Sequence, residues 1–129
     1  MVSTASETIS PDTVVHGLGG SDILNLRLKP KEELLNPSGI SVFLGGTPNE
    51  AADQVRVAFP HATRLLQAAT RVGTATVAAI RNSGFDVISQ PTRHFANHAR
   101  LIHPDGLNGF SDAKLRLLSQ AFQDSIRSE

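Results

Sequence analysis

The stretch PTRHFANHARLIHPDG, residues 91–106, combines three histidines and two arginines with turn residues and short apolar side chains. Histidine suits proton transfer because its unperturbed pKa lies near neutrality. An arginine beside it can bind a phosphate and stabilise developing negative charge. These groups are the minimum equipment for metal-free RNA cleavage. The catalytic candidates are His98 and Arg100, with His94 as a third.

The segment HARLIH, residues 98–103, alternates as a β-strand does. Ala99 and Leu101 are the better core residues, and their neighbours His98 and Arg100 point to the opposite face. We therefore expect His98 and Arg100 on the open face of a sheet. The loop before the strand can fold back towards that face, and the predicted binding residues of the stretch are Arg93, Thr92 and His103.

Two other interpretations of this stretch stay open. Its polar residues can be ordinary loop and surface groups, with Arg100 pairing with Asp86 on a neighbouring strand. A metal site would use His94, His98 and His103. Pro91 and the alternation after Asn97 argue against the helix that would align the first two, and on a strand His103 points away from His98. We predict no metal and no cofactor.

Glycine-rich stretches invite a phosphate-loop interpretation that their spacing does not support. His16 precedes GLGG, but this pattern lacks the GxGxxG spacing and the Lys-Ser/Thr pair of a Walker A loop, so a plain loop over 16–22 is expected. FLGGTPNE, residues 43–50, places glycines before a helix N-terminus. Pro48 removes one N–H donor there, and Glu50 already supplies negative charge. No serine lies in a GxSxG motif.

The elements that must position these residues follow from local pattern. Thr47, Pro48 and Glu50 form a capping box with proline at the first helical position, and Pro60 ends or bends this helix. A second expected helix is capped by Gly73 and buries Ala62, Leu65, Leu66, Ala69 and Val72. A third expected helix runs from about Thr74 to Asn82 and is closed by Gly84 and Phe85. The last expected helix is capped by Ser111 and buries Leu115, Leu118, Phe122 and Ile126. Strands are expected over 23–28, 39–46, 85–90 and 98–103, with one helical turn around 32–35.

The resulting order is β-β-α-α-α-β-β-α. Segregated runs of strands and helices indicate an α+β fold, with a small, mostly antiparallel sheet of about four strands and three to four helices on one face. A chain of 129 residues suits one domain. We expect a flexible N-terminal segment over 1–13 and a single domain over 14–129, because the first residues carry little apolar content.

Composition narrows the function classes. Lys plus Arg and Asp plus Glu both number 12, which removes the excess positive charge of a general DNA binder. The chain has no cysteine, so thiolate metal sites and disulfides are excluded. No apolar run suits a membrane span and the N-terminus lacks a signal-peptide pattern, so we expect no membrane association and a cytoplasmic location.

Two stretches carry a family resemblance: LRLKPKEELLNPSGISVFLGGTPNEA, residues 26–51, and VGTATVAAIRNSGFDVISQPTRHFANHARLI, residues 72–102. Together they resemble a set of small uncharacterised bacterial proteins, which share a charged KPKEE segment before a GISV strand and a later loop and strand ending in NHAR. The resemblance implies a bacterial accessory protein. It carries over no catalytic residue.

The neutral charge and the lack of a complete catalytic constellation favour a protein-interaction module that works beside a larger protein partner. Its contact surface would comprise the glycine-flanked strands and the 91–106 segment. The alternative is a metal-independent RNA-cleaving or nucleotide-modifying effector, toxin-like, that uses His98, Arg100 and His94 on an RNA or nucleotide substrate. Whether the protein is an enzyme stays open between these two hypotheses.

Overall fold

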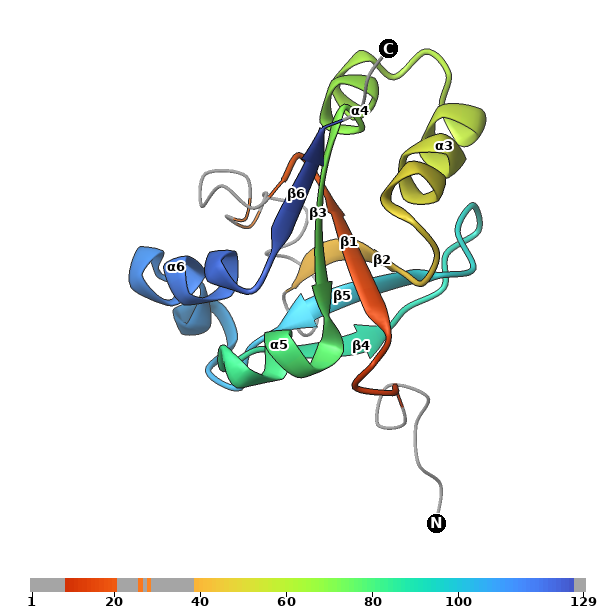
Figure 1. Cartoon of the computed structure of the whole chain (residues 1–129). Helices are drawn as coiled ribbons and strands as arrows, with labels where there is room; N and C mark the ends of the chain where they lie inside the picture. Colours follow the sequence, from red (N-terminus) through yellow and green to blue (C-terminus); the bar gives the residue numbers. More distant parts are fainter. Residues whose placement is uncertain (1–8, 21–25, 27, 29–38, 127–129) are drawn as a thin grey trace.

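The computed structural model describes residues 9–20, 26, 28 and 39–126, and it confirms the α+β class (Figure 1). The strands are β1 (Val14–Leu18), β2 (Ile40–Leu44), β3 (Arg71–Thr76), β4 (Asp86–Ser89), β5 (His98–Ile102) and β6 (Gln123–Ile126). The helices are α3 (Pro48–Ala58), α4 (Thr63–Ala68), α5 (Val77–Asn82) and α6 (Asp112–Gln120), with a 3₁₀ helix over Gly106–Phe110. The sheet has six strands where the sequence predicted about four.

All six strands form one antiparallel sheet in the order β4-β5-β2-β1-β3-β6. The pairing at the centre of the sheet is short, because β1 and β2 share two registered residue pairs, Val15↔Leu44 and His16↔Phe43. The pairing of β1 with β3 runs through five residues, from Val14 to Leu18. The sheet therefore consists of two three-stranded halves. Figure 1 shows β1, β3 and β6 crossing the direction of β2, β4 and β5.

The register sorts the side chains of the sheet onto two faces. On one face Val15, Val42 and Leu101 pack with Ile80 of α5 and Leu118 of α6 in the main core cluster. A second, smaller cluster lies on the other face, where Ala52 of α3 and Ala69 after α4 pack with Val72 of β3 and Leu18 of β1.

The prediction that the helices lie on one face is therefore wrong. The reason lies in β3, where Val72 and Ala75 point to opposite faces and belong to different clusters. A central strand with apolar residues on both faces needs cover on both sides.

Several local predictions are confirmed. The Thr47 hydroxyl accepts a hydrogen bond from the Glu50 N–H at 3.1 Å, and the Glu50 carboxylate accepts one from the Thr47 N–H at 2.8 Å. Gly84 has a positive φ of 98°, and Phe85 after it is buried. The Ser111 side chain caps α6. These signals depend on neighbouring residues alone, which is why the sequence contains them.

Four expected elements differ from the structure. Residues 16–18 belong to β1, and the predicted loop begins only at Gly19 and Gly20, both with positive φ. The second helix ends at Ala68, and residues 71–76 form β3, so Gly73 is a strand residue and caps nothing. The third helix begins at Val77, where the Thr76 hydroxyl accepts from the N–H of Ala79 at 3.1 Å. The last helix ends at Gln120, and the chain continues as β6.

The predicted strand over 23–28 and the helical turn around 32–35 lie almost entirely outside the described residues. Leu26 is the exception of note: it is helical and buried in the main core cluster, so the strand is wrong at this position. Within the N-terminal segment, residues 1–8 are likewise outside the described part. Carbonyl groups of Pro11 and Thr13 accept hydrogen bonds from the N–H groups of Ala78 and Val77, which ties residues 11–13 to α5.

Candidate functional site

The connection between β4 and β5, residues 90–97, is an exposed loop with a defined internal structure. We call it the β4–β5 loop. The Gln90 N–H donates to the His98 carbonyl at 2.8 Å and closes its base. Within the loop, the Thr92 N–H donates to the Phe95 carbonyl at 2.9 Å, and the Phe95 N–H donates to the Thr92 hydroxyl at 3.1 Å. The predicted binding residue Thr92 thus stabilises the loop through its side chain.

Asn97 and Phe95 attach the β4–β5 loop to the sheet. The Asn97 carbonyl accepts from the Leu44 N–H at 2.9 Å, and its side-chain amide donates to the Leu44 carbonyl at 3.0 Å. The ring of Phe95 meets the ring of Phe43 edge to face, with centroids 5.0 Å apart. These contacts fix the loop to β2, so its exposed residues are held in place.

His94 lies on the outer side of this loop and against the end of α3. Its imidazole stacks edge to face on Phe59, with centroids 4.9 Å apart, and Phe95 lies 5.9 Å from the same ring. His94, Arg93, Thr92 and Pro91 are all exposed. The loop therefore presents a cation, an imidazole and a hydroxyl-bearing residue from a supported backbone.

His98 is buried, contrary to the prediction that it lies on an open face. Only 9% of its surface is exposed. Its Nδ1 lies 2.8 Å from the Gln90 carbonyl, and because a carbonyl can only accept, Nδ1 carries the hydrogen. The ring packs edge to face against Phe43 at 5.9 Å. His98 thus helps to close the base of the β4–β5 loop.

Arg100 shares the face of His98, as predicted, but it is also buried, with 5% of its surface exposed. Burial lowers the pKa of its guanidinium. In the sheet it lies between Ser41 of β2 and Ile88 of β4. The prediction of an open face is therefore wrong for Arg100 as well as for His98. Alternation along the strand shows which face of the sheet a side chain is on, but only the packing of other residues decides whether that face is covered.

Asp86, proposed as a surface partner of Arg100, has a hydrogen bond to another residue. The Nε of Arg81 donates to its carboxylate at 3.0 Å. Both residues are partly exposed. Arg81 precedes Asp86 by five positions across the turn at Gly84, so the pair is local. The sequence could have indicated this pair, because a basic residue ends the helix and an acidic residue begins the next strand.

His103 lies at the other end of β5. Five residues along a strand span about 17 Å, and the odd spacing turns His103 to the face opposite His98. Its ring packs 4.8 Å from the ring of Phe85 and against Gly109, where a Cβ would overlap it. The structure thus separates His103 from His94 and His98. In the described part of the chain, no three His, Asp or Glu side chains are grouped as they would be to hold a metal ion.

Two polar residues, Asp105 and Lys114, lie beside the Nδ1 edge of His103. The Asp105 N–H donates to its Nδ1 at 3.1 Å, so Nδ1 is an acceptor. The Lys114 ammonium donates to the Asp105 carboxylate at 2.9 Å. This hydrogen bond, and then the charge of Lys114, lower the pKa of Asp105. The Asp105 carboxylate is 3.8 Å from Nδ1, too far to orient the imidazole as a catalytic carboxylate would.

His16 is a buried polar residue of β1, whereas the sequence predicted it in a loop. It is 1% exposed, and its ring joins three segments. Nε2 lies 3.0 Å from the Gly46 carbonyl and must donate to it, while Nδ1 lies 2.8 Å from the Thr74 hydroxyl. In the neutral imidazole Nδ1 accepts from that hydroxyl. Thr74 is 58 residues away, so no local spacing could have indicated the contact.

The structure therefore divides the predicted site residues into three groups. His98 and Arg100 are buried side by side along one face of β5, Thr92, Arg93 and His94 are exposed on the β4–β5 loop, and His103 lies at the far end of the strand. Comparisons with known protein families, curated proteins and solved structures found no match for the chain. No helix among the described residues has the length and apolar character to cross a membrane.

Proposed function

We propose that the protein is a protein-interaction module and that the β4–β5 loop is its contact surface. The observation that carries the proposal is the contrast between the two sides of this loop. Its inner side is held by hydrogen bonds at Thr92 and Asn97 and by the ring of Phe95, while Arg93 and His94 are exposed. A loop fixed before binding loses little conformational entropy when a partner docks.

The chemistry of the exposed residues suggests what the partner offers. Arg93 brings five N–H donors, and His94 brings an imidazole stacked on Phe59. A matching protein surface would carry carboxylates or backbone carbonyl groups. The bacterial origin and the cytoplasmic location in this proposal rest on the sequence alone, as does the expectation that the partner is larger.

Site-specific crosslinking tests the contact surface. The photoreactive residue p-benzoylphenylalanine replaces Arg93 in one full-length variant and Arg116, an exposed residue of α6, in a matched control. Illumination in living cells is expected to give a discrete adduct at position 93 that is absent at position 116. Adducts of equal yield at both positions, or none at position 93, would contradict the proposal.

The crosslinked partner then allows a measurement of affinity. With the purified partner, we expect His94→Ala to weaken binding by about tenfold or more, while Arg116→Ala leaves it unchanged. His94 is exposed, so its substitution should leave the fold intact. Equal affinity of both variants would show that the loop is not the interface.

The second candidate function remains a metal-independent RNA-cleaving or nucleotide-modifying effector. The observation in its favour is that His98 and Arg100 lie on one face of β5. The burial of His98 and Arg100 weakens the case for this second function, because a substrate phosphate must reach both side chains. The test is incubation of purified protein with RNA in the presence of EDTA. Cleavage that His98→Gln and His94→Ala each reduce by about a hundredfold would favour this function over the interaction module.

A further inference from the structure

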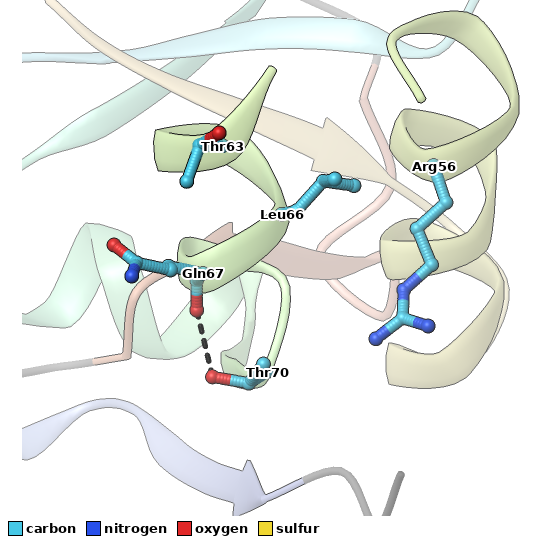
Figure 2. Close-up of a pocket in the computed structure, with 5 residues that line it drawn as sticks. All are labelled: Arg56, Thr63, Leu66, Gln67 and Thr70. Carbon is cyan, nitrogen blue, oxygen red and sulfur yellow. Dashed lines mark hydrogen bonds between the residues drawn. The ribbon is translucent and has the colours of Figure 1, made fainter. Parts of the chain in front are cut away.

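A shallow cavity of about 350 Å³, open to solvent, lies between α3 and α4 (Figure 2). Five residues line it: Arg56, Thr63, Leu66, Gln67 and Thr70. Pockets that bind small molecules have volumes from roughly 300 Å³ upwards. The volume is therefore large enough for a ligand of modest size, and no residue of the β4–β5 loop is among the five that line it.

The lining residues have distinct places in the cavity. Leu66 points from α4 towards α3, and Arg56 runs along the facing side with its guanidinium turned towards the end where Thr70 lies (Figure 2). Arg56, Leu66 and Thr70 are half-buried, whereas Thr63 and Gln67 are exposed at the rim. The side chain of Gln67 points away from Arg56 (Figure 2). The inner part of the cavity thus pairs one apolar side chain with one cation.

The formal charge of the five lining residues favours an anion over a cation. Arg56 is the one ionisable residue among the five that line it. A guanidinium has five N–H donors in a planar fork, so it can bind a ligand in addition to its contacts within the protein. The Thr70 hydroxyl already donates to the Gln67 carbonyl at 2.7 Å. Arg56 is therefore the main donor that a ligand would meet.

We infer that this cavity binds a small organic carboxylate with an apolar body. A carboxylate matches a single guanidinium through two parallel hydrogen bonds. Leu66 would cover the apolar part of the same molecule. Inorganic phosphate fits less well, because a strongly hydrated dianion needs several donors and gains nothing from Leu66.

The test is an NMR titration of the full chain with three probes. Phenylacetate is expected to shift the amide signals of Leu66, Gln67 and Thr70 in a saturable way, with a dissociation constant in the millimolar range. Phenylacetamide, which has the same shape without the charge, is expected to bind about tenfold more weakly. Inorganic phosphate is expected to give no saturable shifts at these amides.

Variants assign the effect to Arg56. Arg56→Gln should weaken phenylacetate binding by about tenfold, and Arg56→Lys, which keeps the charge without the fork, should fall between it and the wild type. Arg64→Gln is the matched control, since Arg64 is an exposed residue of α4 outside the cavity lining. The amide spectrum of each variant reports whether it is folded.

Three outcomes would overturn the inference: no saturable shifts with phenylacetate, equal affinity for phenylacetamide, or phosphate binding tighter than phenylacetate. All three outcomes are measured on the wild-type protein, so they test the inference even if Arg56→Gln does not fold. The titration is also independent of the β4–β5 loop, because Arg93 and His94 stay unchanged throughout.

Discussion

His16 contributes to the fold through two hydrogen bonds that join β1 to β3 and to the connection between β2 and α3. The Thr74 hydroxyl at 2.8 Å and the Gly46 carbonyl at 3.0 Å satisfy both ring nitrogens of a side chain that water does not reach. A buried polar group that loses its partner pays the full cost of its desolvation.

We therefore predict that Thr74→Val, which keeps the shape and removes the hydroxyl, lowers the free energy of unfolding by about 1–3 kcal/mol. Urea denaturation measures the loss. The control is Thr63→Val, an exposed threonine of α4, which should change stability by no more than about 0.5 kcal/mol. Equal losses in the two variants would show that the Thr74–His16 contact contributes nothing specific.

The contact between Lys114 and Asp105 makes a prediction about pH. In the folded chain the hydrogen bond from Lys114, and then its charge, lower the pKa of Asp105, and the unfolded chain lacks this contact. A carboxyl whose pKa is lower in the folded state stabilises the protein above its unfolded pKa. That stabilisation is lost as the pH falls through the folded pKa.

Lys114→Met should accordingly raise the pKa of Asp105 towards its ordinary value, as measured by carbon NMR titration of the carboxyl group. The stability advantage of the wild type over this variant should be present at neutral pH and disappear in acid. Lys114→Arg keeps the charge and should keep the lowered pKa. An Asp105 titration that is the same in wild type and Lys114→Met would contradict the assignment.

At the scale of elements, the edge strand β4 is protected against pairing with another chain. Gln90 and His98 form a hydrogen-bonded pair, so by alternation the N–H groups of Val87 and Ser89 point outward. The Val87 N–H donates to the Asp86 carboxylate at 2.7 Å, and Arg81 holds the same oxygen at 3.0 Å. A charged side chain that occupies an outward N–H blocks strand addition. This favours the β4–β5 loop over the β4 edge as the contact surface.

Asp86→Ala should expose the outward N–H of Val87 and increase self-association, measured as molar mass by light scattering over a concentration series. Asp12→Ala, at an exposed aspartate before β1, changes the net charge equally and should leave the molar mass unchanged. If both variants stay at the wild-type mass, the Asp86 carboxylate does not protect the edge. If both associate, net charge and not the edge is responsible.

At the scale of the whole molecule, the two halves of the sheet share one core. Val15 and Ala75 come from one half, Val42 and Leu101 from the other, and all four belong to the main core cluster. Two registered residue pairs join β1 to β2, and the Gly45 N–H donates to the Val14 carbonyl at 2.9 Å beyond them. This pairing is short, so we expect the shared core to contribute most to holding the halves together. Burial of apolar side chains is the larger stabilising contribution in such a case.

We predict that the two halves unfold together. Native-state hydrogen exchange at the amides of Ala75 on β3 and Ala99 on β5 should give opening free energies that agree within about 1 kcal/mol. The exposed end of α3 serves as the internal reference for local opening, with faster exchange at Val57. A clearly lower opening free energy at Ala75 than at Ala99 would mean that β1, β3 and β6 form a separate cooperative unit.

The sequence by itself determined the features that depend on neighbouring residues. The capping box of α3, the turn at Gly84 with Phe85, and the cap of α6 each involve residues a few positions apart. Strands β2, β4 and β5 were predicted within one or two residues of their ends, because their apolar runs are bounded by turn residues. The alternation in HARLIH likewise placed His98 and Arg100 on one face.

Only the tertiary structure decided the rest. Strands β1, β3 and β6 carry glycine or polar residues that interrupt an apolar pattern. They pair with strands distant in the chain, which no local pattern records. The same holds for the candidate site. Alternation gives the face of a side chain, but whether that face meets water depends on what packs over it, and here the β4–β5 loop and Phe43 enclose His98 and leave His94 exposed.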